Sequence, residues 1–304
     1  MSLCFDGITY MKRQFKKFIL NQLAVLAPEF KARLIYKRAF GKPLNLQSPS
    51  TWNEKINHLK LNDYSNNALV TQCADKYAVR EYIKEKGCEE ILNELYFSCD
   101  SVQEIPWETL PDKFVIKGNH GSGYNLICQN KQSLNIKSAS HLIDGWMKDD
   151  YWKTYVELNY KGIQKKIIGE KYIESANGHG PEDYKIYCFR GVPYCTLLCV
   201  GRDTGTPKYY FFDKEFKFLC YSEDCLALSQ EEINAFVKPE GYDELFEYAT
   251  RLSAPFEFVR VDFYISQGQI IFGELTFTPS AGLDTDILPP TDILLGKMLT
   301  LQQH

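Results

Sequence analysis

The sequence lacks the features that define several large classes of protein. No stretch approaches the ~20 consecutive apolar residues of a membrane-spanning helix. The start of the chain also lacks the order of charge, apolar run and small residues that marks a signal peptide. Lysine and arginine number 35 against 39 acidic residues, for a formal charge of -4, so nothing indicates a nucleic-acid partner. These absences predict a cytoplasmic protein that does not bind nucleic acid.

Metal-binding cysteine patterns are also missing. The chain has ten cysteines and five histidines, but no Cys-x-x-Cys pair and no histidine at ligand spacing to a cysteine, which argues against a zinc site. A chain of 304 residues can bury a large core without disulfides. We therefore interpret the cysteines, including Cys220 and Cys225 beside a short loop, as small buried thiols in a reducing compartment.

Residues 8–41 form a predicted helical stretch with a basic, amphipathic character. Apolar residues such as Phe15, Phe18 and Leu23 interleave with the lysines and arginines. A helix packed on the body with a solvated basic face explains this pattern, and we favour that interpretation. Peripheral contact with anionic lipid or with membrane machinery, at the inner face of the membrane, is the alternative.

The rest of the chain predicts a mixture of helices and mostly antiparallel strands, and hence an α+β fold. Helices are expected near 52–61, 71–86, 138–148 and 230–252. Strands are expected near 113–117, 125–128, 166–173, 184–189, 193–200, 208–212, 258–265 and 269–277.

The strongest local signal for chemistry is the pair of strands at 257–265 and 269–278. If the connecting loop is of odd length, Asp262 and Glu274 face each other on one side of the sheet. Two close carboxylates are tolerated where a cation lies between them, and Mg²⁺ is commonly held by carboxylates together with phosphate oxygens. Arg260 points to the same face and would stabilise developing negative charge. An ordinary hairpin that exposes acidic residues is the alternative.

Two further segments have the character of a nucleotide site. Lys117 ends a strand that runs into the glycine-rich tip Gly118–Gly123, where backbone amides can approach phosphate oxygens. A second strand follows, so this is no Walker loop, and a merely flexible hairpin is the alternative. Glu170-Lys-Tyr-Ile173 ends an apolar strand and would offer backbone groups to an adenine edge and a carboxylate to ribose hydroxyls.

The order of these segments resembles that of the ATP-grasp superfamily, notably its D-alanine-D-alanine ligase-like members, over residues 71–283. Asp75-Lys-Tyr-Ala-Val-Arg80 is similar to the opening Asp-Lys-x-x-x-Lys element, with arginine in the last position. The resemblance implies two α+β lobes that grip ATP, with a helical N-terminal extension. It divides the chain into an N-terminal region (1–105), a lid lobe (106–176) and a catalytic lobe (177–304).

The resemblance also implies roles for particular residues. Arg260 and Lys185 are the expected catalytic residues. Asp262 and Glu274 are the expected Mg²⁺ ligands, with Thr276 where the superfamily usually has asparagine, which puts a second ion in doubt. The expected ATP-binding residues are Arg80, Lys117, Gly118, His120, Gly121, Ser122, Gly123, Glu170, Lys171, Tyr172 and Ile173.

Several phrases, such as Trp52-Asn-Glu-Lys-Ile56 and Asn119-His-Gly-Ser-Gly123, resemble the teichuronopeptide-biosynthesis-like ATP-grasp proteins. That branch implies an ADP-forming carboxylate-amine ligase that attaches an amino acid to a uronic acid. The acceptor would be a surface glycan, such as a capsule or exopolysaccharide, or a nucleotide- or lipid-linked sugar. Arg202 and Lys208 are candidates for binding an anionic acceptor, although exposed loop charges explain them equally simply.

Three alternative functions are consistent with part of these observations. An ATP-grasp kinase of a sugar or lipid hydroxyl has the same fold and a different reaction. Asp284-Thr-Asp286 resembles the Asp-x-Asp motif of sugar-nucleotide transferases, but such a short match arises readily by chance. A non-catalytic nucleotide-binding partner of a polysaccharide machine would bind ATP without turnover.

Overall fold

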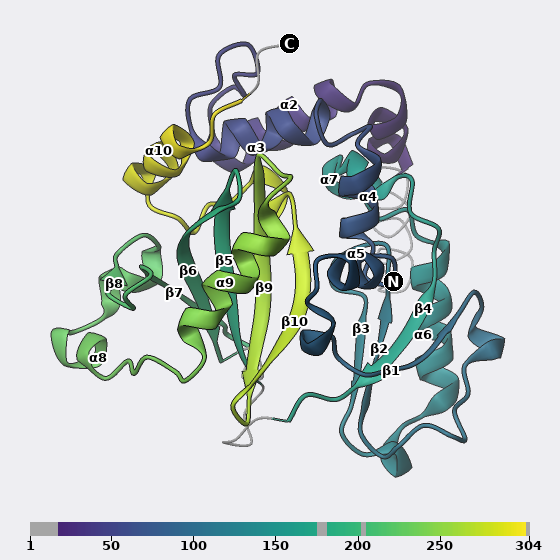
Figure 1. Ribbon diagram of the computed structural model, residues 1–304. Coiled ribbons are helices and arrows are strands. Elements are labelled where there is room, and N and C mark those ends of the chain that lie inside the picture. Colours follow the sequence, from purple (N-terminus) through teal and green to yellow (C-terminus); the bar gives the residue numbers. More distant parts are fainter. Residues whose placement is uncertain (1–17, 175–180, 202–204, 302–304) are drawn as a thin grey trace, which may run out of the picture.

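The computed structural model describes residues 18–174, 181–201 and 205–301. Its strands form two antiparallel sheets that stand side by side (Figure 1). The four-stranded lid sheet has the order β1-β4-β2-β3 and the six-stranded catalytic sheet the order β10-β9-β5-β6-β7-β8. The strands are β1 (Leu95–Cys99), β2 (Phe114–Gly118), β3 (Asn125–Cys128), β4 (Ile167–Lys171), β5 (Glu182–Phe189), β6 (Val192–Val200), β7 (Lys208–Phe212), β8 (Phe218–Leu219), β9 (Phe258–Ser266) and β10 (Gln269–Thr276).

The lid sheet has its own small core. Helix α6 (Ile136–Lys148) begins at Asn135, whose side chain caps the helix by accepting from the Ser138 amide. The helix buries Ile143 and Trp146 in one cluster with Phe114 and other apolar side chains of the sheet. This core makes the lid a stable platform for Lys117 at the end of β2.

Helix α9 (Tyr242–Ser253) covers one face of the catalytic sheet (Figure 1). Tyr184 and Ile186 of β5 alternate with Lys185 and join the same buried cluster as Leu245 and Phe246 of α9. Because side chains alternate along a strand, Lys185 points to the opposite face. That opposite face is therefore free to form a site.

The N-terminal helices pack against the end of the catalytic sheet. Helix α3 (Trp52–Leu61) starts with a capping box between Thr51 and Glu54. Its fully buried Trp52 meets Phe258 edge to face, with ring centroids 4.4 Å apart. Helix α10 (Pro289–Met298) packs on the start of α3. Gly296 permits this contact, because a Cβ there would lie 2.4 Å from the Ser50 carbonyl oxygen.

Most predicted elements are confirmed, but two predicted helices are broken. The stretch 71–86 divides into α4 (Ala68–Ala74) and α5 (Val79–Glu85), because Asp75 ends the first helix and accepts from the Tyr77 and Ala78 amides. The stretch 230–252 divides into α8 (Gln230–Asn234) and α9, with Pro239 and Gly241 between them. The basic stretch is divided by Pro28 at the start of α2 (Pro28–Phe40), and its residues 8–17 lie outside the described part.

The sheets divide the chain differently from the boundaries drawn on the sequence. Strand β1 at residues 95–99 was not predicted, and it pairs with β4 in the lid sheet, upstream of residue 106. Helix α3 lends Trp52 and Ile56 to the core of the catalytic lobe. The N-terminal region therefore contributes to both lobes. A short helix α7 (Trp152–Tyr155) lies before β4.

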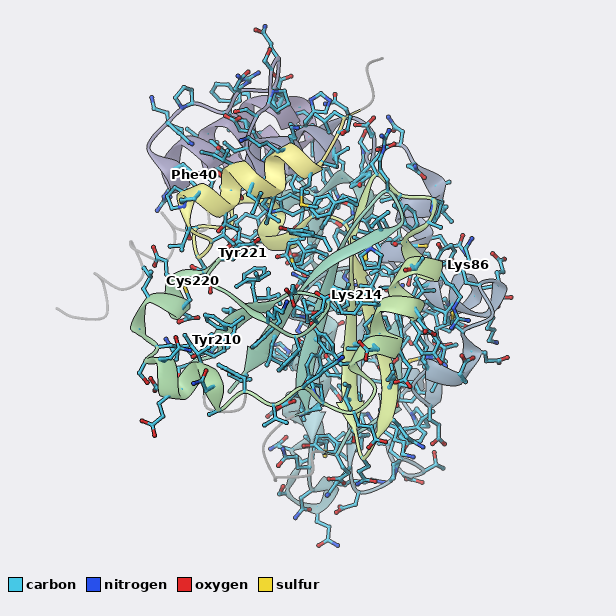
Figure 2. All side chains as sticks on the ribbon, turned by 60° about the vertical axis from the view of Figure 1, so that its left-hand side comes forward. Phe40, Lys86, Tyr210, Lys214, Cys220 and Tyr221 are labelled. Atoms are coloured by element: carbon cyan, nitrogen blue, oxygen red, sulfur yellow. A yellow bond between two sulfur atoms is a disulfide. The ribbon has the colours of Figure 1, made fainter. Side chains whose placement is uncertain are left out.

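One prediction about the cysteines is wrong. Cys220 and Cys225 form a disulfide, because the turn between them brings their Cα atoms to 5.3 Å. Figure 2 labels Cys220 and its neighbour Tyr221, below the yellow helix α10. The seven described free cysteines are buried thiols, as predicted. Within the described residues, no helix is both long enough and apolar enough to cross a membrane.

Candidate active site

A cleft of about 790 Å³ lies between the lid and the catalytic sheet. Its walls include Lys117 and Gly123 from the lid, Ile173 from the segment that joins the lobes, and Lys185 and Asp262 from the catalytic sheet. The face of the catalytic sheet opposite α9 thus forms the floor of the cleft. Residues that the sequence placed in separate motifs meet here.

Asp262 and Glu274 face each other, though not for the reason predicted. The turn between β9 and β10 has two residues, Gln267 and Gly268, both with positive φ. A two-residue turn alone would pair Asp262 with Gly273. A bulge at Gly273 shifts the register by one residue, and Asp262 pairs with Glu274. The prediction required a loop of odd length, and the extra residue is instead in the bulge of β10.

Asp262 is the centre of a buried charge network. Its side chain is 2% exposed and accepts two hydrogen bonds from Arg260, each 2.7 Å long. Lys185, opposite Asp262 on β5, also donates to its carboxylate. The Lys185 ammonium lies 2.9 Å from Asp183 Oδ1 as well. Such charges remain in a buried site only when each is paired and hydrogen-bonded.

Glu274 faces the cleft more openly than Asp262. Burial opposes its charge, but the nearby cations Lys76, Lys185 and Arg260 hold the pKa of Glu274 well below its usual value. The Lys76 ammonium lies 3.4 Å from Glu274 Oε2. The Thr276 hydroxyl donates to Glu274 Oε1 at 3.1 Å and accepts from Arg260 at 3.2 Å. Thr276 therefore orients its two neighbours, and its predicted metal ligation stays a prediction.

On the lid side, Lys117 and Arg80 converge on the same carboxylate. Lys117 Nζ lies 2.6 Å from Glu170 Oε2, and Arg80 Nη1 lies 3.8 Å from Glu170 Oε1. Lys117 lines the cleft. Arg80 also donates to the Asn93 carbonyl at 3.0 Å. In this arrangement Glu170 positions Lys117.

Only part of the glycine-rich tip reaches the cleft wall. Ser122 and Gly123 line the cleft. The Gly118 amide is bonded to the Tyr124 carbonyl, and a Cβ on Gly121 would collide with the Tyr151 ring at 2.5 Å. The phosphate-facing part is therefore shorter than predicted.

His120 does not line the cleft. Its ring is 3% exposed and Nε2 lies 3.0 Å from the Trp146 carbonyl oxygen of α6. Burial lowers the pKa of His120, which favours a neutral ring. In this arrangement His120 supports the lid from within, and its predicted phosphate contact stays a prediction.

The segment that joins the lobes presents Lys171, Tyr172 and Ile173 to the cleft. The Lys171 N–H donates to the Glu94 carbonyl, and its C=O accepts from Asn93. Lys171 therefore has its backbone groups engaged already. Tyr172 and Ile173 remain as the predicted adenine-facing surface.

Four acidic or basic residues of the cleft were not among the predicted site residues: Lys76, Asp183, Asp284 and Asp286. Asp183 lies two residues before Lys185, and this spacing indicated that both side chains point to the same face of β5. Lys76 follows Asp75 in the Asp-Lys motif. Of the two acceptor candidates, Lys208 pairs with Asp224 at 2.7 Å. Arg202 lies outside the described residues.

The carboxylates fit the predicted Mg²⁺. A carboxylate has about four lone-pair positions, and Arg260 and Lys185 take three of those on Asp262. One position of Asp262 and the cleft-facing side of Glu274 remain for a hard cation that also takes phosphate oxygens. No third carboxylate or histidine among the described residues joins them in a metal-binding group, so phosphate and water would complete the coordination.

Two lobes that close on a cleft lined by lysines, arginine and paired carboxylates define an ATP-grasp protein. The sequence matches the family described as TupA-like ATPgrasp over residues 54–300. The chain therefore belongs to the TupA-like ATP-grasp family, and the predicted fold is confirmed. No curated protein matches the chain.

Solved structures with some similarity are distant. D-alanine-D-alanine ligase from Bacillus anthracis, complexed with ATP, is 14% identical, with a TM-score of 0.45 over 74% of this chain and 61% of that one. N5-carboxyaminoimidazole synthetase from Staphylococcus aureus, complexed with ADP, is 13% identical, with a TM-score of 0.41 over 75% and 52%. The chain thus spans between half and two thirds of the length of these structures.

Proposed function

We propose that this protein is an ATP-dependent carboxylate-amine ligase that acts through an acyl phosphate and releases ADP. The observation that carries the proposal is the facing pair Asp262 and Glu274, set in one cleft with Lys185 and Arg260 and opposite Lys117. Family membership supports ATP as the nucleotide. The family does not specify the reaction, and the carboxylate-amine ligation is our proposal.

The cleft suggests where each part of the nucleotide binds. Tyr172 and Ile173 would contact the adenine, and Lys117 with the Ser122–Gly123 backbone would hold the phosphates from the lid. Lys185 and Arg260 face them from the floor of the cleft. A Mg²⁺ ion on Asp262 and Glu274 would neutralise the outer phosphate oxygens. Positioning and charge neutralisation are most of what phosphoryl transfer needs from a protein.

The reaction then has two steps. A carboxylate oxygen of the first substrate attacks the γ-phosphorus, the bond to the bridging oxygen breaks, and ADP leaves. An amine attacks the acyl carbon and its C–N bond forms. Phosphate leaves with the former carboxylate oxygen and takes up the proton that the amine loses. Arg260 is held by Asp262 and Thr276, so its guanidinium is ordered before the oxyanion develops.

ADP release and trapping by hydroxylamine test this reaction. The purified protein is incubated with ATP, Mg²⁺, a uronic acid and hydroxylamine. We expect ADP and a hydroxamate, since hydroxylamine intercepts an acyl phosphate. ADP with a stable phosphate ester would instead identify a kinase, and ATP binding without ADP under any acceptor would identify a non-catalytic protein.

For the substrates we propose an amino acid and a uronic acid of a surface glycan or of its nucleotide- or lipid-linked precursor. The sequence phrases shared with teichuronopeptide-biosynthesis-like proteins support this choice. A screen of twenty amino acids against glucuronate- and galacturonate-containing glycans, with ADP release as the signal, tests it. Activity with small carboxylic acids and none with uronic acids would contradict it.

We also propose that the N-terminal helices contact an anionic membrane surface. Phe18, Leu26 and Phe30 are 58%, 79% and 58% exposed, and Lys37 and Arg38 follow in α2. Apolar and basic side chains together favour such a surface. Co-sedimentation with vesicles containing phosphatidylglycerol tests this, and equal binding to neutral vesicles would contradict the role of the basic residues.

A further inference from the structure

Three rows of side chains cross the floor of the cleft along β5 and β9. Asp183 pairs with Tyr264, Lys185 with Asp262, and Tyr187 with Arg260. The rows are ~7 Å apart, since alternate residues of a strand face one side. The first row lies nearest the segment that joins the lobes, because Ser266, next along the sheet, bonds the Glu174 carbonyl. The third row is therefore the end farthest from the adenine position.

Two carboxylates stand above that third row. Asp284 and Asp286 line the cleft together with Tyr187. The Asp284 backbone is fixed by the buried Asn53, which accepts from its N–H at 2.7 Å and donates to its C=O at 3.1 Å. The Asp286 carbonyl accepts from the Glu223 N–H at 2.8 Å. Both residues are thus held in place by their backbones while their side chains line the cleft.

These two carboxylates have no cation of their own within the described part of the chain. The charges of Lys185 and Arg260 are already matched by Asp183 and Asp262. Asp284 forms no ion pair, accepts from the Asp286 N–H at 3.2 Å, and gains only a small favourable effect from the charge of Arg260. Burial, with smaller effects from its neighbours, raises the pKa of Asp284 to about 6. The third row thus carries negative charge that a bound cation would neutralise.

A hydroxyl group without a hydrogen-bond partner also favours a bound cation at this place. Tyr187 is 0% exposed, and its hydroxyl has no hydrogen-bond partner among the described residues. Its ring is fixed between Trp52 and Phe211, with ring centroids at 5.7 and 5.8 Å. A buried polar group without a partner is costly, and Tyr187 is one of the residues that line the cleft.

We propose that Asp284, Asp286 and the Tyr187 hydroxyl form the binding site for the ammonium group of the amine substrate. An ammonium has three donors and no acceptor, which matches two carboxylates and a phenol oxygen. Leu197, Phe211 and Ile287 complete the walls and suit a small apolar side chain beside the charge. Arg260 shares this row, so the amine would lie beside the residue proposed to stabilise the oxyanion. The ammonium passes one proton to a carboxylate of this site, and the free amine then attacks the acyl carbon. The inference rests on the proposed ligase function.

The test measures amine binding without turnover. Saturation-transfer NMR is recorded for the full chain with ADP and Mg²⁺, in a pool of the twenty standard amino acids and in a matched pool of their N-acetyl derivatives. We expect signals only from amines, and affinity reduced ~10-fold or more in Asp284→Asn, Asp286→Asn and Tyr187→Phe, the usual effect of losing a charge-assisted hydrogen bond. Glu223→Gln is the control, because its exposed side chain is not part of the cleft wall.

Equal binding of N-acetylated compounds, unchanged affinity in the three variants, or no signal from any amine would overturn the proposal. So would Mn²⁺ binding that is lost in Asp286→Asn, since the acids would then hold a second metal ion. The thermal shift produced by ADP and Mg²⁺ shows that each variant is folded. Amine binding without ADP or hydroxamate formation would contradict the ligase function and leave this site standing.

Discussion

Asp262 accepts from two cations at once, and this arrangement makes it the most sensitive single residue of the site. Asp262→Asn keeps the shape but removes the charge that pairs with Arg260 and Lys185. We expect ADP release to fall ~100-fold or more, because the proposed metal ligand and the orientation of Arg260 are both lost. Removing one member of a buried ion pair also costs about 3 kcal/mol of stability. ADP-release kinetics and thermal unfolding check both effects, with Asp243→Asn as control, because the Asp243 side chain is exposed and lies outside the cleft wall. A variant that retains a tenth of the activity would contradict the assignment.

Asp284 leads to a prediction about pH. Its pKa in the folded protein, about 6, lies above the ordinary value of 3.8. The folded chain therefore keeps a proton that the unfolded chain has released, and stability falls as the pH rises from about 4 to about 6. Asp284→Asn removes this dependence. We expect it to increase the free energy of unfolding by about 3 kcal/mol at pH 7.5 and by little near pH 4. Denaturant unfolding at both pH values measures the difference, and an equal effect at both would show that the carboxyl does not titrate in this way.

At the scale of elements, the bulge at Gly273 decides the register of the β9–β10 hairpin. A Cβ at this position would lie 3.0 Å from the Asp262 carbonyl oxygen and 3.2 Å from the Tyr264 ring. Gly273→Ala must therefore shift the backbone beside Asp262. We expect a loss of activity of about 10- to 100-fold with a smaller loss of stability. Gly268→Ala is the control, because an added Cβ in the turn meets no other atom but strains a backbone with positive φ. It therefore strains the hairpin without moving the backbone beside Asp262. Activity unchanged in Gly273→Ala would show that the register tolerates the added methyl group.

The same hairpin shows how far sequence patterns reach. The alternation of apolar residues predicted the strands well, because burial on one face imposes a period of two. It could not predict the bulge, because the bulge depends on the close approach of Gly273 to the Asp262 carbonyl oxygen on the neighbouring strand. Strand β1 escaped prediction because four of its five residues are only half buried. Asp75 and Pro239 broke predicted helices through local capping and turn chemistry, which periodicity does not record.

For the whole molecule, the site exists only where separate segments meet. Lys76 precedes Glu274 by nearly two hundred residues, yet its ammonium bonds the Gly121 carbonyl at 2.7 Å and approaches Glu274 at 3.4 Å. Lys76 thereby links the glycine-rich tip to the catalytic sheet. Motif order predicted most of the floor of the cleft. It did not predict Asp284 and Asp286, because the fold of the loop after β10 over Tyr187 depends on the distant Asn53.

Because the nucleotide would contact both lobes, it should stabilise them together. At 100 times its dissociation constant, a ligand adds about 2.7 kcal/mol to the free energy of unfolding, so we expect ATP with Mg²⁺ to raise the Tm by several degrees. Lys117→Met should reduce that rise, since Lys117 is the lid's charged contact with the cleft. Lys148→Met is the matched control, because Lys148 is a lid lysine on α6 that is exposed, pairs with Asp144 and lies outside the cleft wall. Thermal unfolding with and without ATP measures the shift. If Lys117→Met kept the full rise, the nucleotide would not be held by the end of β2, and the proposed phosphate contact of the lid would be wrong.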